Sequence, residues 1–223
     1  MAQIVILDVD GTLVDNIYQH SLAWYRAFRR YDIVVPVVRI HRHLGMGGDQ
    51  IVTALVGEEV EEAVGAELRE AWVDEFDLMI DEVRPLPGAS DLIKALKDRG
   101  REVVLASSAQ PQHTDRFLDL LGVREVVDGW TTSEDVERTK PEPDLIEVAL
   151  ERVGGEAGDA VMVGDTTWDI EAASKLGVPV VAVRTGGFGD DELLGAGASA
   201  VYDTPAAVLA ELDDGPLAVG RRN

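Results

Sequence analysis

The chain has 223 residues, of which 46% are hydrophobic and 28% charged, a balance typical of a folded protein with a substantial core. Its 20 Lys and Arg residues against 42 Asp and Glu give a net charge of −22, which would repel nucleic acid and anionic lipid, so we expect neither as a partner. The absence of cysteine excludes disulfides, thiol catalysis and cysteine metal sites.

The first predicted element is a buried strand. Ile4–Leu7 is an apolar run that ends abruptly in Asp8-Val9-Asp10-Gly11-Thr12. Residues 15–84 follow with a different pattern, because apolar residues recur there at three- and four-residue spacing with acidic residues between them. These apolar residues are Leu22, Tyr25, Ala27 and Phe28 and, later, Val60, Val64, Leu68, Trp72 and Phe76. This spacing predicts a helical insertion, which Pro85-Leu86-Pro87-Gly88 closes.

Beyond the insertion, short apolar runs alternate with helical patterns. Further buried strands are predicted at Val103–Ala106, Val161–Val163 and Val178–Val183, with the run Ala200–Tyr202 as a further candidate. Helices are predicted at Ala89–Asp98, Gln112–Leu121, Pro143–Val153 and Asp169–Leu176, each with a glycine shortly after its end. The alternation predicts an α/β fold, a doubly wound, Rossmann-like parallel sheet with helices on both faces. We expect residues 1–14 and 85–223 to form this core and residues 15–84 to form the insertion.

Polar side chains follow three of the predicted strands at their carboxyl ends, where ligands bind in doubly wound sheets. They are Asp8, Asp10 and Thr12 after the first strand, Ser107 and Ser108 after the next, and Asp165 and Asp169 after Val161–Val163. Carboxylates about 4 Å apart repel each other by on the order of 4 kcal/mol at an effective dielectric near 20, so such a cluster needs protons or a cation.

Two positive charges suit this cluster. Oxygen ligands without cysteine favour magnesium over zinc. Lys140, one of only four lysines in the chain, stands in a loop just before a predicted helix and is the natural second charge. A solvated loop position is the alternative for Lys140, and simple helix capping is the alternative for Asp169.

These residues resemble the four motifs of the haloacid dehalogenase-like superfamily in order and separation. The matching stretches are Asp8-Val9-Asp10-Gly11-Thr12-Leu13-Val14-Asp15, Ser107, Lys140-Pro141 and Gly164-Asp165-Thr166-Thr167-Trp168-Asp169. The resemblance is closest to the subgroup with a helical cap after the first motif, which includes phosphoglycolate phosphatase and β-phosphoglucomutase. It implies a magnesium-dependent phosphatase, phosphoglycolate phosphatase-like, that hydrolyses a small phosphate monoester through an aspartyl-phosphate.

The resemblance also implies a role for each matching residue. Asp8 would be the nucleophile that takes the phosphoryl group, and Asp10 would be the general acid and base. For this role Asp10 must hold a proton at neutral pH, so its pKa is expected above the usual value of about 3.9. Lys140 would hold Asp8 and neutralise developing charge. The remaining matches would shape the turn (Gly11, Thr12), bind phosphoryl oxygens (Ser107, Ser108) and hold magnesium (Asp8, the Asp10 main-chain carbonyl, Asp165, and Asp169 as a ligand or its support).

Residues outside the motifs separate the reactions of the family. Its dehalogenases lack the second aspartate, so Asp10 disfavours that reaction. Its phosphonate hydrolases use a cap lysine. Because residues 1–93 contain no lysine, that reaction is excluded if residues 15–84 form the cap. Sugar phosphomutases of the β-phosphoglucomutase type carry a histidine that His20 matches, but they also carry a cap lysine and a glutamate where this chain has Gly164. Phosphomutase is therefore the alternative to phosphatase.

The cap is expected to contact the substrate through His41-Arg42-His43-Leu44-Gly45-Met46-Gly47-Gly48-Asp49. Its glycines would let a loop approach the ligand, and Arg42 or a histidine would meet a polar group. The alternative is that Arg42 and these histidines only decorate a helix surface. A small phosphorylated metabolite is the expected partner, with phosphoglycolate, sugar phosphates and pyrophosphate all left open, as is the oligomeric state.

Two further expectations concern the class and location of the protein. The hypothesis from another class is a phospho-accepting, receiver-type signalling module, which keeps its acidic pair adjacent and has no helical insertion, unlike this chain. No run of eighteen apolar residues occurs, and the first residues form no basic segment. We therefore expect no signal peptide, no membrane span and a cytoplasmic location.

Overall fold

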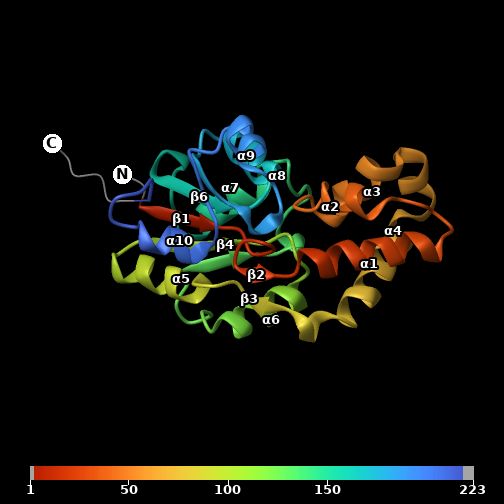
Figure 1. Ribbon diagram of the computed structural model, residues 1–223, viewed down its shortest axis with the longest axis horizontal. Coiled ribbons are helices and arrows are strands. Elements are labelled where there is room, and N and C mark those ends of the chain that lie inside the picture. Colours follow the sequence, from red (N-terminus) through yellow and green to blue (C-terminus); the bar gives the residue numbers. More distant parts are fainter. Residues whose placement is uncertain (1–2, 218–223) are drawn as a thin grey trace.

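The computed structural model describes residues 3–217, which contain a six-stranded parallel sheet (Figure 1). Its strand order is β5-β4-β1-β6-β7-β8, so β1 lies in the interior and pairs with β4 on one side and β6 on the other. The strands are β1 (Ile4–Leu7), β4 (Glu102–Ala106), β5 (Gly129–Thr131), β6 (Ala160–Gly164), β7 (Val180–Val183) and β8 (Ala200–Tyr202).

Successive residues of each strand pack on opposite faces of the sheet, as the period-two geometry of a strand requires. Val5 and Leu7 belong to a buried cluster with α5, α6 and α10, whereas Ile4 and Ile6 belong to a second cluster with α7, α8 and α9. The helices are α5 (Ala89–Asp98), α6 (Pro111–Leu121), α7 (Asp144–Arg152), α8 (Thr167–Lys175), α9 (Asp190–Ala196) and α10 (Pro205–Ala210). The predicted doubly wound α/β fold is confirmed.

In the sequence, a helical insertion follows β1 and precedes all other strands of the main sheet. In space, the insertion lies to one side of the sheet (Figure 1). Its helices are α1 (Ile17–Arg30), α2 (Val37–His41), α3 (Gly48–Val56), α4 (Glu58–Asp77) and the 3₁₀ turn Ile80–Glu82. The four α-helices share a buried cluster that is separate from the two clusters of the sheet and contains Trp24, Phe28, Ile40, Ile51 and Leu68. At the base of the insertion, β2 (Val14–Asp15) and β3 (Arg84–Pro85) pair antiparallel.

From this separate core we infer a cap domain at residues 15–84 and a sheet domain at residues 1–14 and 85–223. Residues 1–2 and 218–223 at the ends of the sheet domain lie outside the described residues.

Several elements differ from the sequence-based expectation. The edge strand β5 and the β2–β3 ribbon were not predicted, because they are too short to carry an apolar pattern. The strand expected from Val178 begins at Val180, since Pro179 has no N–H to donate to a ladder. The last sheet-domain helix before β7 begins two residues earlier than expected, at Thr167, where Thr166 caps it. Leu22, expected on the apolar face of its helix, is 40% exposed.

Among the described residues, no helix is both long and apolar enough to span a membrane.

The two ends of α5 provide a matched test of how tightly the sheet domain packs. Gly88 and Gly100 both have positive φ angles, of 80° and 72°, but a Cβ on Gly88 would lie 2.5 Å from Cα of Ala206 whereas one on Gly100 would meet nothing within 4 Å. Gly100→Ala should therefore lower the free energy of unfolding by about 1–2 kcal/mol, from backbone strain alone. Gly88→Ala should cost a further amount of about 1–3 kcal/mol from overpacking. Urea unfolding of both variants checks this, and equal losses would contradict the close contact with α10.

Candidate active site

The carboxyl end of β1 runs directly into a tight loop that turns two aspartates toward the edge of the sheet. The Asp8 N–H still donates to the Val163 carbonyl at 2.9 Å, so Asp8 continues the strand. The chain then turns back on itself, with the N–H groups of Leu13 and Val14 donating to the Val9 carbonyl at 2.8 Å and 3.1 Å. Gly11 takes a φ of 76° within this loop. Asp8 is thereby fixed at the end of an interior strand.

A buried lysine joins two of the acidic segments. Lys140, in the loop before α7, is 1% exposed, and its Nζ donates to Asp8 and, at 2.7 Å, to Oδ1 of Asp169. Thr12 links the same two segments a second time, because its hydroxyl donates to Oδ1 of Asp165 at 2.7 Å and lies 3.1 Å from Oδ2 of Asp8. The structure thus brings together Asp8, Thr12, Lys140, Asp165 and Asp169 at one edge of the sheet.

These carboxylates carry more negative charge than Lys140 can balance. Ligand oxygens of Asp8, Asp165 and Asp169 all lie within 4.8 Å of one another. Burial raises the pKa of Asp8 to about 7, against the opposing charge of Lys140. Burial also raises the pKa of Asp165 well above its ordinary value, and the charges of Asp8 and Asp169 add to the effect. Burial alone would lower the pKa of Lys140, but the two carboxylates raise it, so the ammonium stays charged.

The donor set fits a hard divalent cation such as Mg²⁺. Oδ2 of Asp165 is buried and has no hydrogen-bond partner among residues 3–217, which is costly for an ionised oxygen without a cation. Only glycine fits beside this oxygen, since a Cβ on Gly11 or Gly186 would lie 2.3 Å or 2.0 Å from it. Asp8 and Asp165 therefore suit direct ligation, as all-oxygen donors do for magnesium.

Asp169 has a different place in the cluster. Its Oδ2 accepts hydrogen bonds from the Thr166 N–H at 3.0 Å and the Thr166 hydroxyl at 2.7 Å, which caps the start of α8. Its Oδ1 accepts from Lys140. Because both oxygens of Asp169 already accept hydrogen bonds from the protein, Asp169 is better suited to holding Lys140 than to binding a metal directly.

Asp10 has its contacts in the insertion instead of in the carboxylate cluster. Its Oδ1 accepts a hydrogen bond from Asn16 Nδ2 and lies 3.1 Å from Nε2 of His20. Burial alone would raise the pKa of Asp10, but the hydrogen bonds from His20 and Asn16 and the charges of His20 and Lys140 lower it below its ordinary value. The expectation of a raised pKa is therefore wrong for this arrangement, because neither partner could be assigned to Asp10 before the fold was known.

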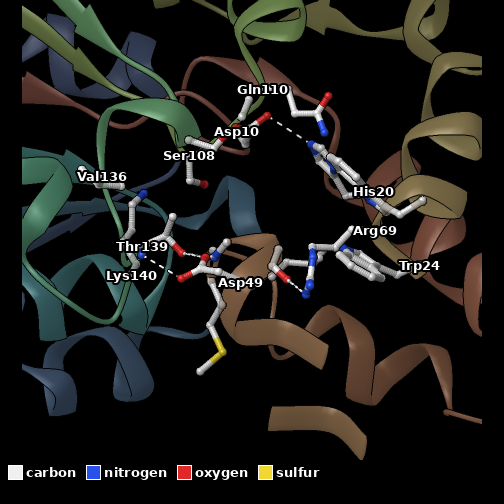
Figure 2. Close-up of a pocket in the computed structure, with 18 of the residues that line it drawn as sticks. Asp10, His20, Trp24, Asp49, Arg69, Ser108, Gln110, Val136, Thr139 and Lys140 are labelled. Carbon is white, nitrogen blue, oxygen red and sulfur yellow. Dashed lines mark hydrogen bonds and ion pairs between the residues drawn. The ribbon is translucent and has the colours of Figure 1, made fainter. Parts of the chain in front are cut away.

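The two serines after β4 lie in different environments. Ser107 is fully buried, and its Oγ accepts hydrogen bonds from the Ala109 N–H at 3.1 Å and from Thr114 Oγ1 at 3.4 Å, so it shapes the loop after the strand. Ser108 lines the cavity next to Asp10 (Figure 2).

A cavity of about 240 Å³ lies between the sheet edge and the insertion (Figure 2). Asp8, Asp10, Ser108 and Lys140 line one end of it. The other end is formed by the insertion, through aromatic and polar side chains that include His20, Trp24, Trp72, Arg69 and Asp49. His20 is stacked 4.2 Å from Phe76 and 5.5 Å from Trp72, ring centre to ring centre, so α1 and α4 fix its position.

Arg42 lies outside this cavity. Its guanidinium pairs with Glu192 of α9 and lies 4.0 Å above the ring of Phe188, so it joins the insertion to the sheet domain instead of meeting a ligand. The neighbouring histidines are also engaged elsewhere, since Nε2 of His41 lies 2.9 Å from the Gly186 carbonyl and Nδ1 of His43 lies 2.8 Å from the Arg39 carbonyl. The expected loop does reach the cavity, but through its later residues 44–49.

Several cavity residues were not predicted from the sequence. The sequence pattern places Trp72 on the apolar face of a helix and does not indicate that it lines a cavity. Trp24 and Arg69 belong to no motif that would indicate a binding residue. Asn16, the hydrogen-bond partner of Asp10, directly follows the first motif, and this position could have indicated that it belongs to the site.

Comparisons with known proteins agree with this geometry. The model of a family described as haloacid dehalogenase-like hydrolase matches residues 2–177. Phosphoglycolate phosphatase of Rhodospirillum rubrum is 27% identical over 93% of this chain and 90% of its own length. Fructose-1-phosphate phosphatase YqaB of Escherichia coli is 26% identical over 81% and 95%. The crystal structure of a hydrolase from Pseudomonas syringae superposes with a TM-score of 0.90 at 30% identity and covers 95% of this chain and 98% of that one.

The unpartnered carboxylate of Asp165 predicts opposite effects of one substitution with and without metal. A carboxyl whose pKa is raised by folding destabilises the folded state once the pH exceeds the pKa of that carboxyl in the unfolded chain. Asp165→Asn should therefore remove this loss of folding free energy at pH 7.5 in EDTA. We expect its melting temperature to rise by roughly 2–4 °C, the shift that about 1 kcal/mol gives a chain of this size. With millimolar Mg²⁺ the unchanged chain should gain stability and the variant should not.

Calorimetry with and without Mg²⁺ measures this reversal, and Asp15→Asn, at an exposed aspartate, is the control. A Mg²⁺-induced stabilisation of Asp165→Asn as large as that of the unchanged chain would contradict the assigned ligand.

Proposed function

The chain belongs to the haloacid dehalogenase-like hydrolases and is an enzyme of their phosphatase type, and we propose that it hydrolyses a small phosphate monoester with Mg²⁺ through a phosphoryl group carried on Asp8. The observation that carries this proposal is the buried contact of Lys140 with both Asp8 and Asp169 at the floor of the cavity. It leaves Asp8 oriented by Lys140 on one oxygen and by Thr12 on the other.

In the first step, one carboxylate oxygen of Asp8 forms a bond to phosphorus while the ester P–O bond breaks. Lys140 keeps its charge beside Asp8 and stabilises the negative charge that develops on the phosphoryl oxygens. Ser108 lines the same cavity as Asp8 and Lys140 and would donate a hydrogen bond to these oxygens. Mg²⁺, held by Asp8, Asp165 and the Asp10 main-chain carbonyl, would add further positive charge there.

Asp10 carries the proton in both steps of this proposal. It protonates the leaving alcohol, then takes a proton from the water that attacks the aspartyl-phosphate, which releases phosphate and restores the Asp8 carboxylate. The hydrogen bonds from His20 and Asn16 now lower the pKa of Asp10, but a phosphate dianion beside it acts in the opposite direction, because a like charge raises the pKa of a carboxyl.

Phosphomutase is the second candidate, and the position of His20 favours it, since its Nε2 lies 3.1 Å from Asp10 as a cap histidine of that class would require. The packing around Gly164 argues against it. A Cβ at this position would lie 2.6 Å from Cγ of Asp169, so the glutamate that phosphomutases carry here does not fit.

The receiver-type signalling module is distinguished by turnover. A receiver-type module releases at most one phosphate per protein, whereas a phosphatase releases many.

We propose a small phosphorylated metabolite as the partner, with neither nucleic acid nor membrane, and the cytoplasm as the location. The net charge of −22 supports the exclusion of nucleic acid and anionic membranes, because it repels polyanions over most of the surface. Side-by-side assays of phosphate release from phosphoglycolate, hexose phosphates and pyrophosphate identify the preferred leaving group.

The role of Asp8 is tested by its isosteric replacement. Asp8→Asn should abolish Mg²⁺-dependent hydrolysis of p-nitrophenyl phosphate, because an amide does not form the acyl phosphate. Nitrophenolate absorbance measures the rate, and Asp15→Asn, outside the cavity, serves as the control that should keep the original rate. Turnover by Asp8→Asn at the original rate would refute the proposed nucleophile.

The role of Asp10 is tested by a trapped intermediate. Asp10→Ala should lower the rate of hydrolysis about 10²–10⁴-fold, the usual contribution of a positioned acid or base. With p-nitrophenyl phosphate the leaving group needs no proton, so the first step proceeds while the second step loses its base. Phosphorylated Asp8 should therefore accumulate and appear in mass spectra of protein quenched in acid. An unchanged rate of hydrolysis would exclude Asp10 as the proton carrier.

A further inference from the structure

Residues 45–49 of the insertion lie directly against the two sheet-domain segments that hold Lys140 and Asp169. The Gly47 N–H donates to Thr139 Oγ1 at 3.0 Å, and a Cβ on Gly47 would lie 2.1 Å from the same oxygen. A Cβ on Gly45 would lie 2.6 Å from Oγ1 of Thr166, the residue that caps α8 together with Asp169. Only glycine allows the insertion to approach this closely.

Asp49 makes the most specific of these contacts. Its Oδ2 accepts a hydrogen bond from the Thr139 N–H at 3.0 Å, and its Oδ1 accepts one from the Thr139 hydroxyl (Figure 2). Thr139 is only 4% exposed, and among residues 3–217 its N–H donates to Asp49 alone. The sheet domain itself thus offers no replacement for the carboxylate of Asp49.

Thr139 directly precedes Lys140, so its position sets where the lysine side chain begins. Lys140 is fully buried, and its Nζ contacts Asp8 and Asp169. Proline at 141 and 143 limits the conformations of the chain that follows. A shift of Thr139 is therefore transmitted to the contact between Lys140 and Asp8.

We propose that Asp49 is a positioning residue, whose carboxylate fixes Thr139 and thereby holds Lys140 against Asp8 only while the insertion is seated on the sheet domain. This inference rests on the proposed function, since it takes Lys140 as the catalytic lysine. A leaving group that keeps the insertion from seating would then be processed slowly even if it binds, because Lys140 would not be held in place. Asp49 in this way makes the phosphoryl-transfer rate depend on the fit of the rest of the substrate.

A separate contact between the two parts of the chain, this one an ion pair, provides a matched control. Arg42 of the insertion pairs with Glu192 of α9, and neither residue contacts Thr139. Glu192→Gln removes the charge of this pair, while its amide oxygen still accepts from the Gly189 N–H as Glu192 Oε2 does at 2.9 Å. If Asp49 acted only by docking the insertion, both substitutions would have the same effect.

Steady-state kinetics with p-nitrophenyl phosphate and Mg²⁺ test the proposal. Asp49→Ala should lower kcat about 10- to 100-fold with a smaller change in KM, because a displacement of about 1 Å near the reacting groups can cost about 100-fold in rate. Asp49→Asn should restore part of this loss, since its amide oxygen still accepts from the Thr139 N–H. The double variant Asp49→Ala/Thr139→Val should be no slower than the slower single variant, as expected for two residues of one contact. Glu192→Gln should keep kcat within about twofold.

A second measurement does not depend on turnover. The chain has only four lysines, so reductive methylation followed by peptide mapping reports Lys140 against Lys94, Lys97 and Lys175 as internal references. Asp49→Ala should raise the methylation rate of Lys140 at least tenfold relative to the other three, while Asp49→Asn raises it less and Glu192→Gln leaves it unchanged. Circular dichroism confirms that each variant is folded.

The outcomes separate this inference from the proposed function. An active unchanged chain with original kcat and Lys140 methylation in Asp49→Ala overturns the positioning role alone. Equal losses in Asp49→Ala and Glu192→Gln also overturn it, because they indicate docking only. A protein that turns over no phosphate ester refutes the proposed function, and the methylation rates still decide whether Asp49 holds Lys140.

Discussion

The burial of one ammonium group among several carboxylates is the constraint on which the rest of the site depends. Lys140 is 1% exposed and bonded to both Asp8 and Asp169, while Asp165 lies close to both acids. Ionised groups taken out of water cost several kcal/mol each, and their attraction offsets this only when the geometry is good and every remaining oxygen is satisfied. Here one oxygen is left over, Oδ2 of Asp165, and it marks the place where the protein alone does not complete the site.

The topology explains how residues so distant in sequence reach one point. The strand order places β1 between β4 and β6, so the carboxyl ends of these three strands share one edge of the sheet. Asp8 follows β1, Ser107 follows β4 and Asp165 follows β6. Each acid therefore needs only a strand of the right length behind it, and the buried apolar residues that fix the strands also fix the site.

Much of this arrangement could be predicted from the sequence, because it follows from local patterns. The apolar runs identified five of the six strands of the main sheet, and the rule that ligands bind at carboxyl strand ends predicted that Asp8, Ser107 and Asp165 lie near one another. Lys140 follows no predicted strand, so only its loop position and the family resemblance pointed to it. What the pattern could not give is the direction in which side chains of the insertion point. Arg42 and Asp49 stand in the same glycine-containing segment, yet the orientation of α2 sends Arg42 to Glu192 and the start of α3 sends Asp49 to Thr139.

The pKa of Asp10 shows the same limit in electrostatic form. Its position in the motif suggested a proton-carrying acid, but the sign of a pKa shift depends on neighbours that only tertiary structure supplies, and here His20 and Asn16 stabilise the ionised form. His20 is in turn held by aromatic stacking against Phe76 and Trp72 of α4. The insertion therefore contacts Asp10 directly through His20, and it reaches Asp8 indirectly through Thr139 and Lys140. These are the two carboxylates that carry the proposed reaction. The two contacts come from different helices of the insertion, and they are complete together only when the whole insertion is seated on the sheet.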